Sequence, residues 1–375
     1  MPDKAPEFKI ILNGIPLEEI DMLHIQSLEY DENLRSTSSV QFSLSESSTY
    51  SINPYRLQLG NQLELWMGYF GDLVPVFQGE IFRVYPDAPR GDRPQLIVLA
   101  YDRSYWLKRM DIPRIYTQSN PKLAVEAIIG KYGLACIIEP SNILVQYQID
   151  SDKGLSQIDQ TDWEILDIIS KIGNYEMFVK YNTFYMVNRD YLIGKGNYQK
   201  KTLRYNPITE LKQDEVRMLG FHSEIGIDNQ RLSIEVIGWG SVGNKGEKKG
   251  TITLPELRTK SDEGYTVVKI RNQTIETLRI IGKVARTEPQ ARQLAVAELQ
   301  RRSDSLVKAS FTIPGDAEIF MGQEVGISIN ALGSFGEQHS GNTYFVTGIK
   351  HSLGTDGFIT TVTTERDGIT TARKV

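Results

Sequence analysis

The chain has 375 residues, of which 40% are hydrophobic and 24% are charged. These values are ordinary for a soluble globular protein, and the length is sufficient for two or three domains with separate cores. The net charge of −5 argues against a protein that binds nucleic acid over its whole surface, because such proteins carry a basic excess.

Residues 8–103 read as short strands separated by turns. Asn13-Gly14 lies between two apolar runs and is a strong hairpin signal. Apolar and polar residues alternate in SSVQFSLS and in NQLELWMGY, and the turn-rich PDAPRGDRP separates two later strands. Strands at this spacing, without helices between them, predict an antiparallel β domain over residues 1–105. The pattern fits a sandwich and a barrel equally well.

Residues 106–204 predict a small α/β domain that begins with a helix. Asn120 is placed as the N-cap of NPKLAVEAIIGKYG, and Pro121 occupies the first helical position. The residues expected to share the buried face of this helix are Leu123, Ala124, Ala127 and Ile128.

A second helix and a hairpin complete the predicted α/β domain. The helix TDWEILDIISKIG begins at Thr161 or Asp162 and ends before Gly173. Its expected buried face consists of Trp163, Leu166, Ile169 and Ile172. The hairpin follows in YEMFVKYNTFYMV and is expected to turn at Asn182-Thr183.

Residues 205–375 predict a second β domain, interrupted at about residues 241–304. The interruption begins with GSVGNKGEKKG, which we interpret as a surface loop, and ends with a helix. Thr287 and Gln290 form a capping-box pattern at the start of that helix. Its expected buried face consists of Ala291, Leu294, Ala295 and Leu299.

The two β domains carry a repeated series of segments. VQFSL is echoed by ASFTI, LGNQLELW by MGQEVGIS, FQGEIFRV by FVTGIKHS, and LIVLAYDR by ITTVTTERD. In this comparison Gly60 matches Gly322, and Gly79 is matched with Gly348. All four pairs occur in the same order, which favours a structural duplication. The alternative is that β-strands simply resemble one another.

Motifs that would carry chemistry are weak in this sequence. GWGSVG, with Gly238, Gly240 and Gly243, matches the dinucleotide fingerprint G-x-G-x-x-G, but the following NKGEKKGT is unsuited to the helix that the fingerprint needs. The single cysteine, Cys136, lies in an apolar setting that predicts a buried, inert thiol. The four histidines have no spacing that predicts a metal site, and neither a signal peptide nor a membrane span is expected.

The arrangement of segments resembles the phage late control D family. The resemblance rests on LAYDRSYWL, on SQIDQTDWEILDIISKIGNYEMFVKYNTFYMV, and on the later MGQEVGISI and YFVTGIKHSLGTDGF. Its most specific part runs from Asp162-Trp163 to Val187. This family includes the baseplate hub of contractile phage tails and the N-terminal hub part of type VI secretion spike proteins.

The resemblance implies an α+β, mainly β fold, with two similar antiparallel β-barrel domains flanking the small α/β domain. It also implies a homotrimeric hub made in the bacterial cytoplasm and assembled into a baseplate. Three chains with two similar domains each would form a pseudo-sixfold ring. This ring would join a hexameric inner tube to a trimeric spike, which we expect on a separate chain, and would contact other baseplate components. No enzyme activity, cofactor, metal or specific nucleic-acid binding is expected.

Two other functions remain open at this point: a peptidoglycan-acting baseplate enzyme and a carbohydrate- or receptor-binding β-module. For the hub, the tube-facing elements are expected near residues 60–67 and 322–329. The 106–200 unit and the 241–260 loop are the candidates for spike and baseplate contacts. The candidate contact residues are Gly60, Leu63, Leu65, Met67, Gly322, Val325, Ile327, Ile329, Lys245, Lys248 and Lys249.

Overall fold

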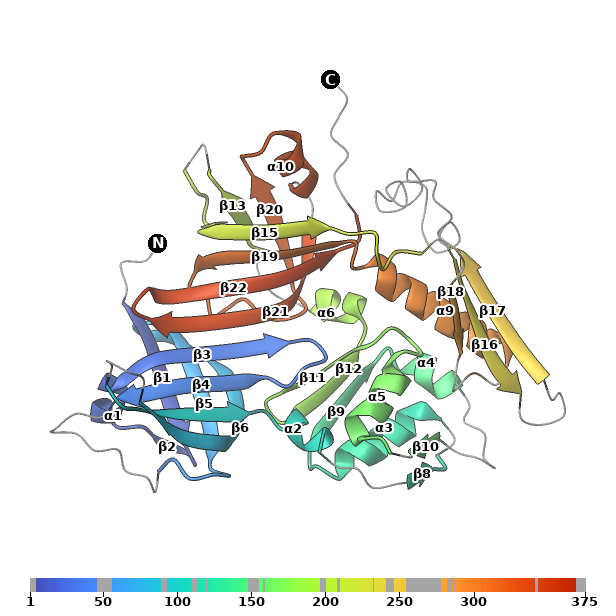
Figure 1. Ribbon diagram of the computed structural model, residues 1–375, viewed down its shortest axis with the longest axis horizontal. Helices are drawn as coiled ribbons and strands as arrows, with labels where there is room; N and C mark the ends of the chain where they lie inside the picture. The colour runs from blue at the N-terminus through green and yellow to red at the C-terminus, as the bar shows by residue number, and fades with distance from the viewer. Residues whose placement is uncertain are drawn as a thin grey trace.

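In the computed structural model, the described residues form three hydrophobic cores, two in β units and one in a region of mixed strands and helices (Figure 1). Strands predominate, as the sequence predicts. The structure describes residues 5–45, 56–88, 93–109, 114–118, 120–147, 155–157, 159–195, 200–207, 210–231, 233–240, 246–253, 278–281, 285, 287–340 and 343–368.

The first β unit surrounds a core formed by the alternating apolar residues of its strands. Phe42, Leu63 and Leu65 are each fully buried there, which is the consequence of period-two side-chain alternation. Asn13 and Gly14 form the predicted tight turn, both with positive φ. The elements are β1 (Pro6–Leu12), β2 (Ile15–Pro16), α1 (Glu19–Leu23), β3 (Ile25–Asn33), β4 (Ser39–Ser45), β5 (Gln62–Tyr69), β6 (Asp72–Asp87) and β7 (Gln95–Tyr101).

The second β unit is built in the same way around Phe311, Val325 and Tyr344. The short α10 (Ser334–His339) follows one of its strands. The strands are β13 (Thr202–Tyr205), β14 (Glu215–Arg217), β15 (Gly220–Ile225), β19 (Val307–Pro314), β20 (Glu324–Ile329), β21 (Thr343–Gly354) and β22 (Gly357–Arg366).

Five strands of the first unit recur in the second in the same spatial order. The first unit has the order β3-β4-β7-β6-β5, and the second has β15-β19-β22-β21-β20. Every neighbouring pair in both series is antiparallel. The predicted duplication is therefore confirmed for these five strands.

Two local irregularities are also repeated. The pairing of β6 with β7 shifts between Ile81 and Arg83, and the pairing of β21 with β22 shifts between Val346 and Gly348. Each shift is a β-bulge, a device that bends and twists a strand at a defined point. Bulges at equivalent positions indicate that the two units share their curvature as well as their strand order.

The glycine corner before β5 is reproduced before β20. Gly60 and Gly322 have φ values of +86° and +84°, in the region that favours glycine. The Gly60 N–H donates to the Ile81 carbonyl at 2.8 Å, and the Gly322 N–H donates to the Val346 carbonyl at 2.9 Å. In return, the Ile81 N–H donates to the Asn61 carbonyl, and the Val346 N–H donates to the Gln323 carbonyl, each at 2.9 Å.

The repeat is limited in two respects. β1 lies antiparallel to β5, whereas its counterpart β13 lies parallel to β20, so the sixth strand is not duplicated. The predicted match of Gly79 with Gly348 is wrong. Gly79 lies opposite Leu63, while Tyr344 occupies the corresponding place opposite Val325, and Gly348 lies beyond the bulge.

The two units join into one sheet of 14 strands. In the described part of the chain, β3 pairs with β4 and with β21 of the second unit, and β1 pairs with β5 and β2. The end strands of the first unit thus do not pair with each other there, so the predicted closure into separate barrels is not observed as a hydrogen-bonded ring. The physical reason is that β3 uses its outer edge to bond the second unit.

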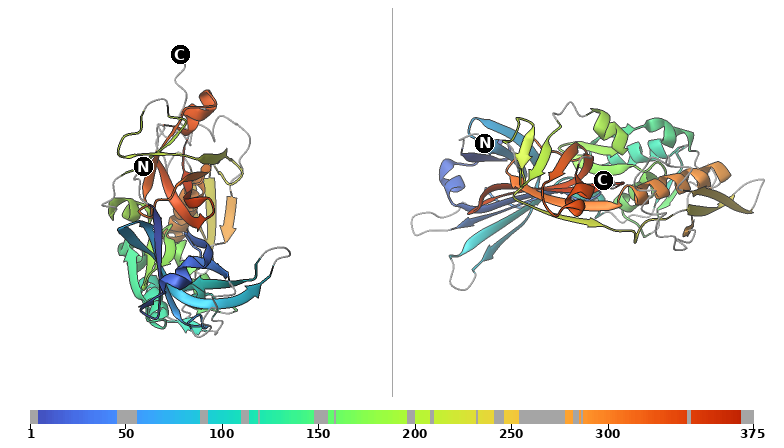
Figure 2. Two further views of the ribbon diagram at one scale, coloured as in Figure 1. Left: turned by 90° about the vertical axis from the view of Figure 1, so that its left-hand side faces the viewer. Right: turned by 90° about the horizontal axis from the view of Figure 1, so that it is seen from above.

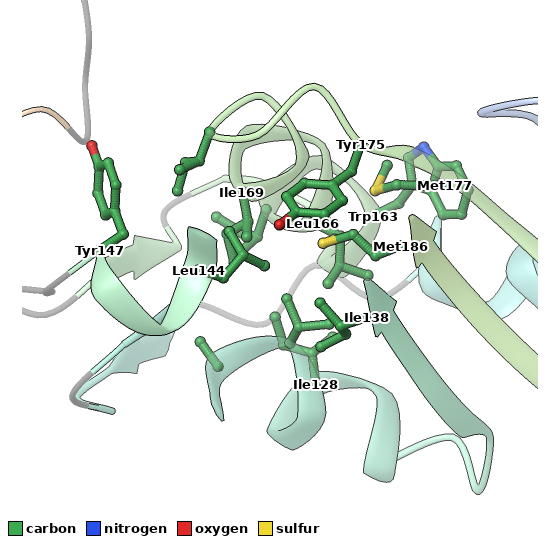
Figure 3. Packing of buried hydrophobic residues seen from close by; sticks show 14 of the residues in the cluster. Ile128, Ile138, Leu144, Tyr147, Trp163, Leu166, Ile169, Tyr175, Met177 and Met186 are labelled. Carbon is green, nitrogen blue, oxygen red and sulfur yellow. The ribbon is translucent and has the colours of Figure 1, made fainter. Parts of the chain in front are cut away.

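The third region begins as the predicted α/β unit. β12 pairs antiparallel with β11 and parallel with β9, and helices pack against this small sheet (Figures 1 and 3). The elements are α2 (Ser104–Leu107), β8 (Arg114–Tyr116), α3 (Pro121–Gly130), β9 (Ala135–Glu139), α4 (Ser141–Gln146), β10 (Leu155–Gln157), α5 (Asp162–Ser170), β11 (Glu176–Lys180), β12 (Thr183–Val187) and α6 (Arg189–Lys195).

The helix starts follow the sequence closely. The Asn120 side chain accepts from the Leu123 N–H, and Thr161 forms a capping box with Glu164, which selects Thr161 over Asp162 as the N-cap. The predicted buried face of α5 is confirmed. In α3 the stripe is shifted, because Leu123 and Ala127 are exposed while Val125 and Ile129 are buried.

The hairpin between β11 and β12 turns one residue earlier than predicted. Lys180 pairs with Thr183, so Tyr181 and Asn182 form the turn, and Tyr181 has a φ of +54°. A tyrosine is an unusual turn residue. Its hydroxyl donates to the Pro75 carbonyl at 2.6 Å, which fixes the turn against the first β unit.

The interruption of the second β unit begins earlier than predicted, at β16 (Ser233–Gly240). β16 pairs with β17 (Gly246–Thr253) and β18 (Leu278–Ile281), and α9 (Glu288–Ser303) packs on this sheet. Buried residues of β16 and α9 share one core with α3 and α5. The side chain of Thr287 caps α9 as predicted, and the four expected residues of its face are buried.

The GSVGNKGEKKG segment is not simply a loop. Residues 246–250 belong to strand β17, and Gly238 and Gly240 lie in β16, whereas Gly243 lies outside the described residues. Because a strand rather than a helix follows Gly240 in the described chain, the dinucleotide fingerprint lacks the helix N-terminus that would bind a pyrophosphate.

The glycine corners supply a direct stability test. Gly60→Ala should lower the free energy of unfolding by about 1–2 kcal/mol, because a Cβ strains a residue at positive φ. Its Cβ would meet no neighbouring atom, so the effect isolates the backbone. Gly322→Ala should cost more, because its Cβ would come within 2.9 Å of Leu192 Cδ1. Urea unfolding measures both variants.

Gly130→Ala is the matched control for this test. Gly130 is the last residue of α3, its Cβ would also meet open space, and its φ is not positive. Alanine should therefore leave stability unchanged or raise it by up to about 1 kcal/mol. Equal losses for Gly60→Ala and Gly130→Ala would contradict the role assigned to the corner.

Candidate assembly interfaces

The junction between the two β units is a strand pairing. β3 and β21 run antiparallel from Leu28 opposite Leu353 to Asn33 opposite Gly348. The Leu34 N–H extends the ladder by donating to the Thr347 carbonyl at 2.9 Å. The pairing begins at the bulge of β21, where the contact of β21 with β20 ends. One edge of β21 therefore serves two strands in succession, one from each unit (Figure 1).

Buried rings close this junction on one face. Tyr30 of β3 stacks on His351 of β21 with ring centroids 5.8 Å apart, and Phe358 lies 5.7 Å from the same imidazole. Phe358 belongs to the second unit but packs in the core of the first. His351 Nδ1 and Thr360 Oγ1 form a hydrogen bond of 2.9 Å. Burial, with a smaller contribution from the positive charge of Lys180, lowers the pKa of His351 to about 3.

A buried carboxylate connects the α/β region to both β units. Glu176 of β11 lies 2.9 Å from Arg35 Nε, just after β3, and 3.0 Å from Arg189 Nε of α6. Arg189 also pairs with Glu365 of β22. Burial opposes the charge on Glu176, but the guanidinium groups of Arg35 and Arg189 outweigh it and hold its pKa below the ordinary value.

A pocket of about 560 Å³ lies where the three regions meet. Its ionic side chains pair with one another. Lys180 contacts Glu32 at 3.0 Å, and Lys201 contacts both Asp316 and Glu318. These ion pairs connect the segments that line the pocket. We therefore interpret the pocket as part of the junction between the β units and not as a ligand site.

The predicted tube-facing side chains do not lie on the surface. Leu63, Leu65 and Met67 are fully buried in the first core. Val325, Ile327 and Ile329 are 0–5% exposed in the second. Their alternation with polar residues is the signature of an inward face, so an interface on β5 or β20 would have to use the intervening residues. Gly60 is exposed at its corner, whereas Gly322 is buried beneath Leu192.

The predicted lysine cluster is only partly described. Lys249 is exposed on β17, and Lys248 lies on the same strand. Lys245 lies outside the described residues. The role of these residues in spike or baseplate contacts stays a prediction.

Sequence reasoning missed the Glu176 network and the β3–β21 pairing. Glu176 and Arg35 are far apart in the chain, and charged residues at these positions carry no local pattern that points to a partner. Among the described residues, no group of three His, Cys, Asp or Glu side chains could hold a metal ion. Cys136 is half-buried and not fully buried as predicted, but burial raises its thiol pKa to about 12, as expected of an inert thiol. None of the described helices has the length and apolar character needed to cross a membrane.

A family model described as the Alg8 N-terminal domain matches residues 35–355. The chain belongs to this family. The match is not to the late control D family, so the resemblance to that family stays a prediction. No curated protein sequence matches this chain.

Solved structures show the same fold. A tail protein from Neisseria meningitidis MC58 matches with a TM-score of 0.64 and 13% identity, over 97% of this chain and 98% of that chain. The 43 kDa tail protein of prophage MuSo2 from Shewanella oneidensis matches with a TM-score of 0.64 and 11% identity, over 98% and 100%.

A third match links this fold to secretion systems. It is an E. coli component of the type VI secretion system, described as structurally similar to the T4 bacteriophage tail proteins gp27 and gp5. Its TM-score is 0.53 at 11% identity, over 96% of this chain and 76% of that chain. The likeness predicted from the sequence to phage tail and type VI proteins is thus confirmed for the fold.

Glu176→Gln tests the buried network. Removal of the Glu176 charge leaves the guanidinium groups of Arg35 and Arg189 without their shared carboxylate. The free energy of unfolding should therefore fall by about 3–5 kcal/mol. Glu29→Gln is the control, because Glu29 pairs with Lys350 at 3.0 Å but both side chains are about half exposed. That variant should change stability by less than about 1 kcal/mol. Similar losses in both variants, measured by urea unfolding, would contradict the assignment.

His351 predicts a dependence of stability on pH. The folded state keeps the imidazole neutral down to about pH 3, whereas the unfolded chain binds a proton near the ordinary pKa of 6.5. The free energy of unfolding should therefore fall as the pH is lowered, by about 2 kcal/mol between pH 7 and 5 from this group alone. His351→Gln cannot titrate and should lack this component. Parallel curves for both proteins would refute the prediction.

Proposed function

We propose that this chain is a structural hub protein of a contractile phage tail or injection apparatus. Three copies would form a ring that joins a hexameric inner tube to a trimeric spike. The fold shared with phage tail proteins and with a type VI secretion component supports this proposal. A chain of a Francisella PdpA–VgrG complex matches this fold as well, which makes a spike and other baseplate proteins the partners to test.

The observation that carries the proposal is the duplicated five-strand unit. A trimer of single units offers three equivalent positions, and a hexameric neighbour presents six. A chain with two similar units removes this mismatch, because three chains then present six similar units. The shared bulges and glycine corners keep the curvature of both units alike, as such a ring requires.

We further propose that the role is not catalytic. Side chains with strongly shifted pKa values are frequent in active sites, but here they join structural elements. Glu176 and Arg189 connect three regions, and His351 lies within the junction. Burial raises the pKa of Asp102 to about 6, while its carboxylate accepts the N–H groups of Ser38 and Ser104 and so anchors the start of β4. A cleared band in a cell-wall zymogram would oppose this conclusion.

Mass photometry of the pure protein tests the hub proposal. The expected species of the protein alone has roughly 128 kDa, three times the chain mass of 42.5 kDa; if a trimeric spike protein is needed for assembly, the complex should have this mass plus that of one spike trimer. A stable dimer or tetramer would contradict the proposal, because neither provides six equivalent units around a threefold axis.

A further inference from the structure

The junction between the two units uses an edge strand of the first and the outer half of a long strand in the second. Among the described residues, the strands that correspond to β3 and β21 in the other unit have no such partner. β15 corresponds to β3, and in the described chain it pairs with β19 alone. β6 corresponds to β21, and beyond its bulge the described residues bond it to β7 but to no strand on the other side.

These two edges lie on opposite sides of the β3–β21 junction in the strand order of the sheet. In Figure 1 the strands follow one another from β15 through β19, β22 and β21 to β3 and β4, and β6 lies beyond them. The ends of β6 and β7 project from the body of the molecule (Figure 2). One chain thus exposes a β3-like edge at one end and a β21-like edge at the other.

We propose that β15 of one copy pairs with the outer half of β6 in the next copy and so reproduces the β3–β21 junction between chains. This inference rests on the proposed trimeric hub and assigns its subunit interface. The partner is a second copy of this chain, because the only strand shown to fit such an edge is the equivalent strand of the same protein. Unpaired strand edges are templates for this kind of addition.

The register follows from the internal repeat. Val40 of β4 and Ala309 of β19 are equivalent positions in the repeat. Tyr30 lies opposite Val40, and Ser223 lies opposite Ala309, so Tyr30 and Ser223 are equivalent as well. The bulges make Arg83 equivalent to Gly348. Transfer of the observed β3–β21 pairs then places Ile225 opposite Val84, Glu224 opposite Tyr85, and His222 opposite Asp87.

The side chains at these positions suit a strand contact. Ile225 and Tyr85 are 37% and 40% exposed, and pairing would remove part of this apolar surface from water. Ile225 would meet the half-buried Val84, and the imidazole of His222 would face the carboxylate of Asp87. Pro86 has no N–H, so the ladder should be strongest between Phe82 and Tyr85.

The contact is head to tail, so its geometry decides whether copies close into a ring. If the rotation that relates the two units within the chain is one sixth of a full turn, and each junction between chains applies the same rotation, six units close after three copies. The same β pairing would then run around the whole ring, alternating between junctions within and between chains.

Disulfide trapping tests the proposed register. In a Cys136→Ala background, Tyr85→Cys and Glu224→Cys are introduced into one chain. Both residues are exposed, and in the transferred register they form a pair without mutual hydrogen bonds, where Cβ atoms approach closely enough for a disulfide. Mild oxidation at high protein concentration should yield covalent dimers and trimers on non-reducing gels, with the trimer as the end product.

Two controls match this variant. Asp31→Cys with Lys350→Cys occupies the equivalent pair of the observed junction and should close within one chain without forming oligomers. Tyr85→Cys with Ile225→Cys shifts the register by one residue and directs the two thiols to opposite faces, so it should not crosslink.

The outcomes separate the inference from the hub proposal. Trimers in mass photometry without the crosslink would overturn the proposed pairing and leave the hub intact. A ladder that continues beyond the trimer would support the pairing and overturn the trimeric ring. A monomer without crosslinks, or equal crosslinking by the register-shifted variant, would overturn the inference.

Discussion

The pairing of β3 with β21 is the contact on which the rest of the structure depends. The outer edge of β3 in the first β unit forms hydrogen bonds with β21 of the second. This pairing joins the two units into one continuous sheet. An antiparallel ladder has a defined register and spacing, so it sets the relation between the units more rigidly than a contact between side chains would. The bulge in β21 makes the pairing possible, because it ends the contact with β20 and bends the strand toward its new neighbour.

The α/β region braces this sheet from one side. Its β11–β12 hairpin contributes Glu176 to Arg35 and Arg189, Lys180 to Glu32, and the Tyr181 hydroxyl to Pro75. Buried charges are expensive to desolvate, so such a network adds less to stability than its short distances suggest. Its consequence is geometric specificity: together with the pair between Arg189 and Glu365 of β22, these contacts are all satisfied only when both β units and the hairpin take one relative position.

A duplicated unit with a defined joint has a consequence for assembly. The chain contains one complete joint and two halves of a second, β15 at one end and β6 at the other. The strand pairing that forms the junction within the chain could therefore be repeated between copies by the equivalent strands. In the proposed pairing between chains, Pro86 takes the place that His351 has within the chain. Because proline has no N–H, the proposed junction has fewer hydrogen bonds than the β3–β21 junction.

Local signals in the sequence determined the individual elements. Asn13-Gly14, the caps at Asn120, Thr161 and Thr287, and the alternation of apolar residues each act within a few residues of themselves, and all are found as predicted. The order of the repeated strands was also readable, because it needs only sequence similarity and not contact. Tertiary structure alone decided the β3–β21 joint, the Glu176 network and the packing of α9 with the α/β region. The partners in these contacts are distant in the chain, and a buried charge or a free strand edge has no periodicity by which its partner could be recognised.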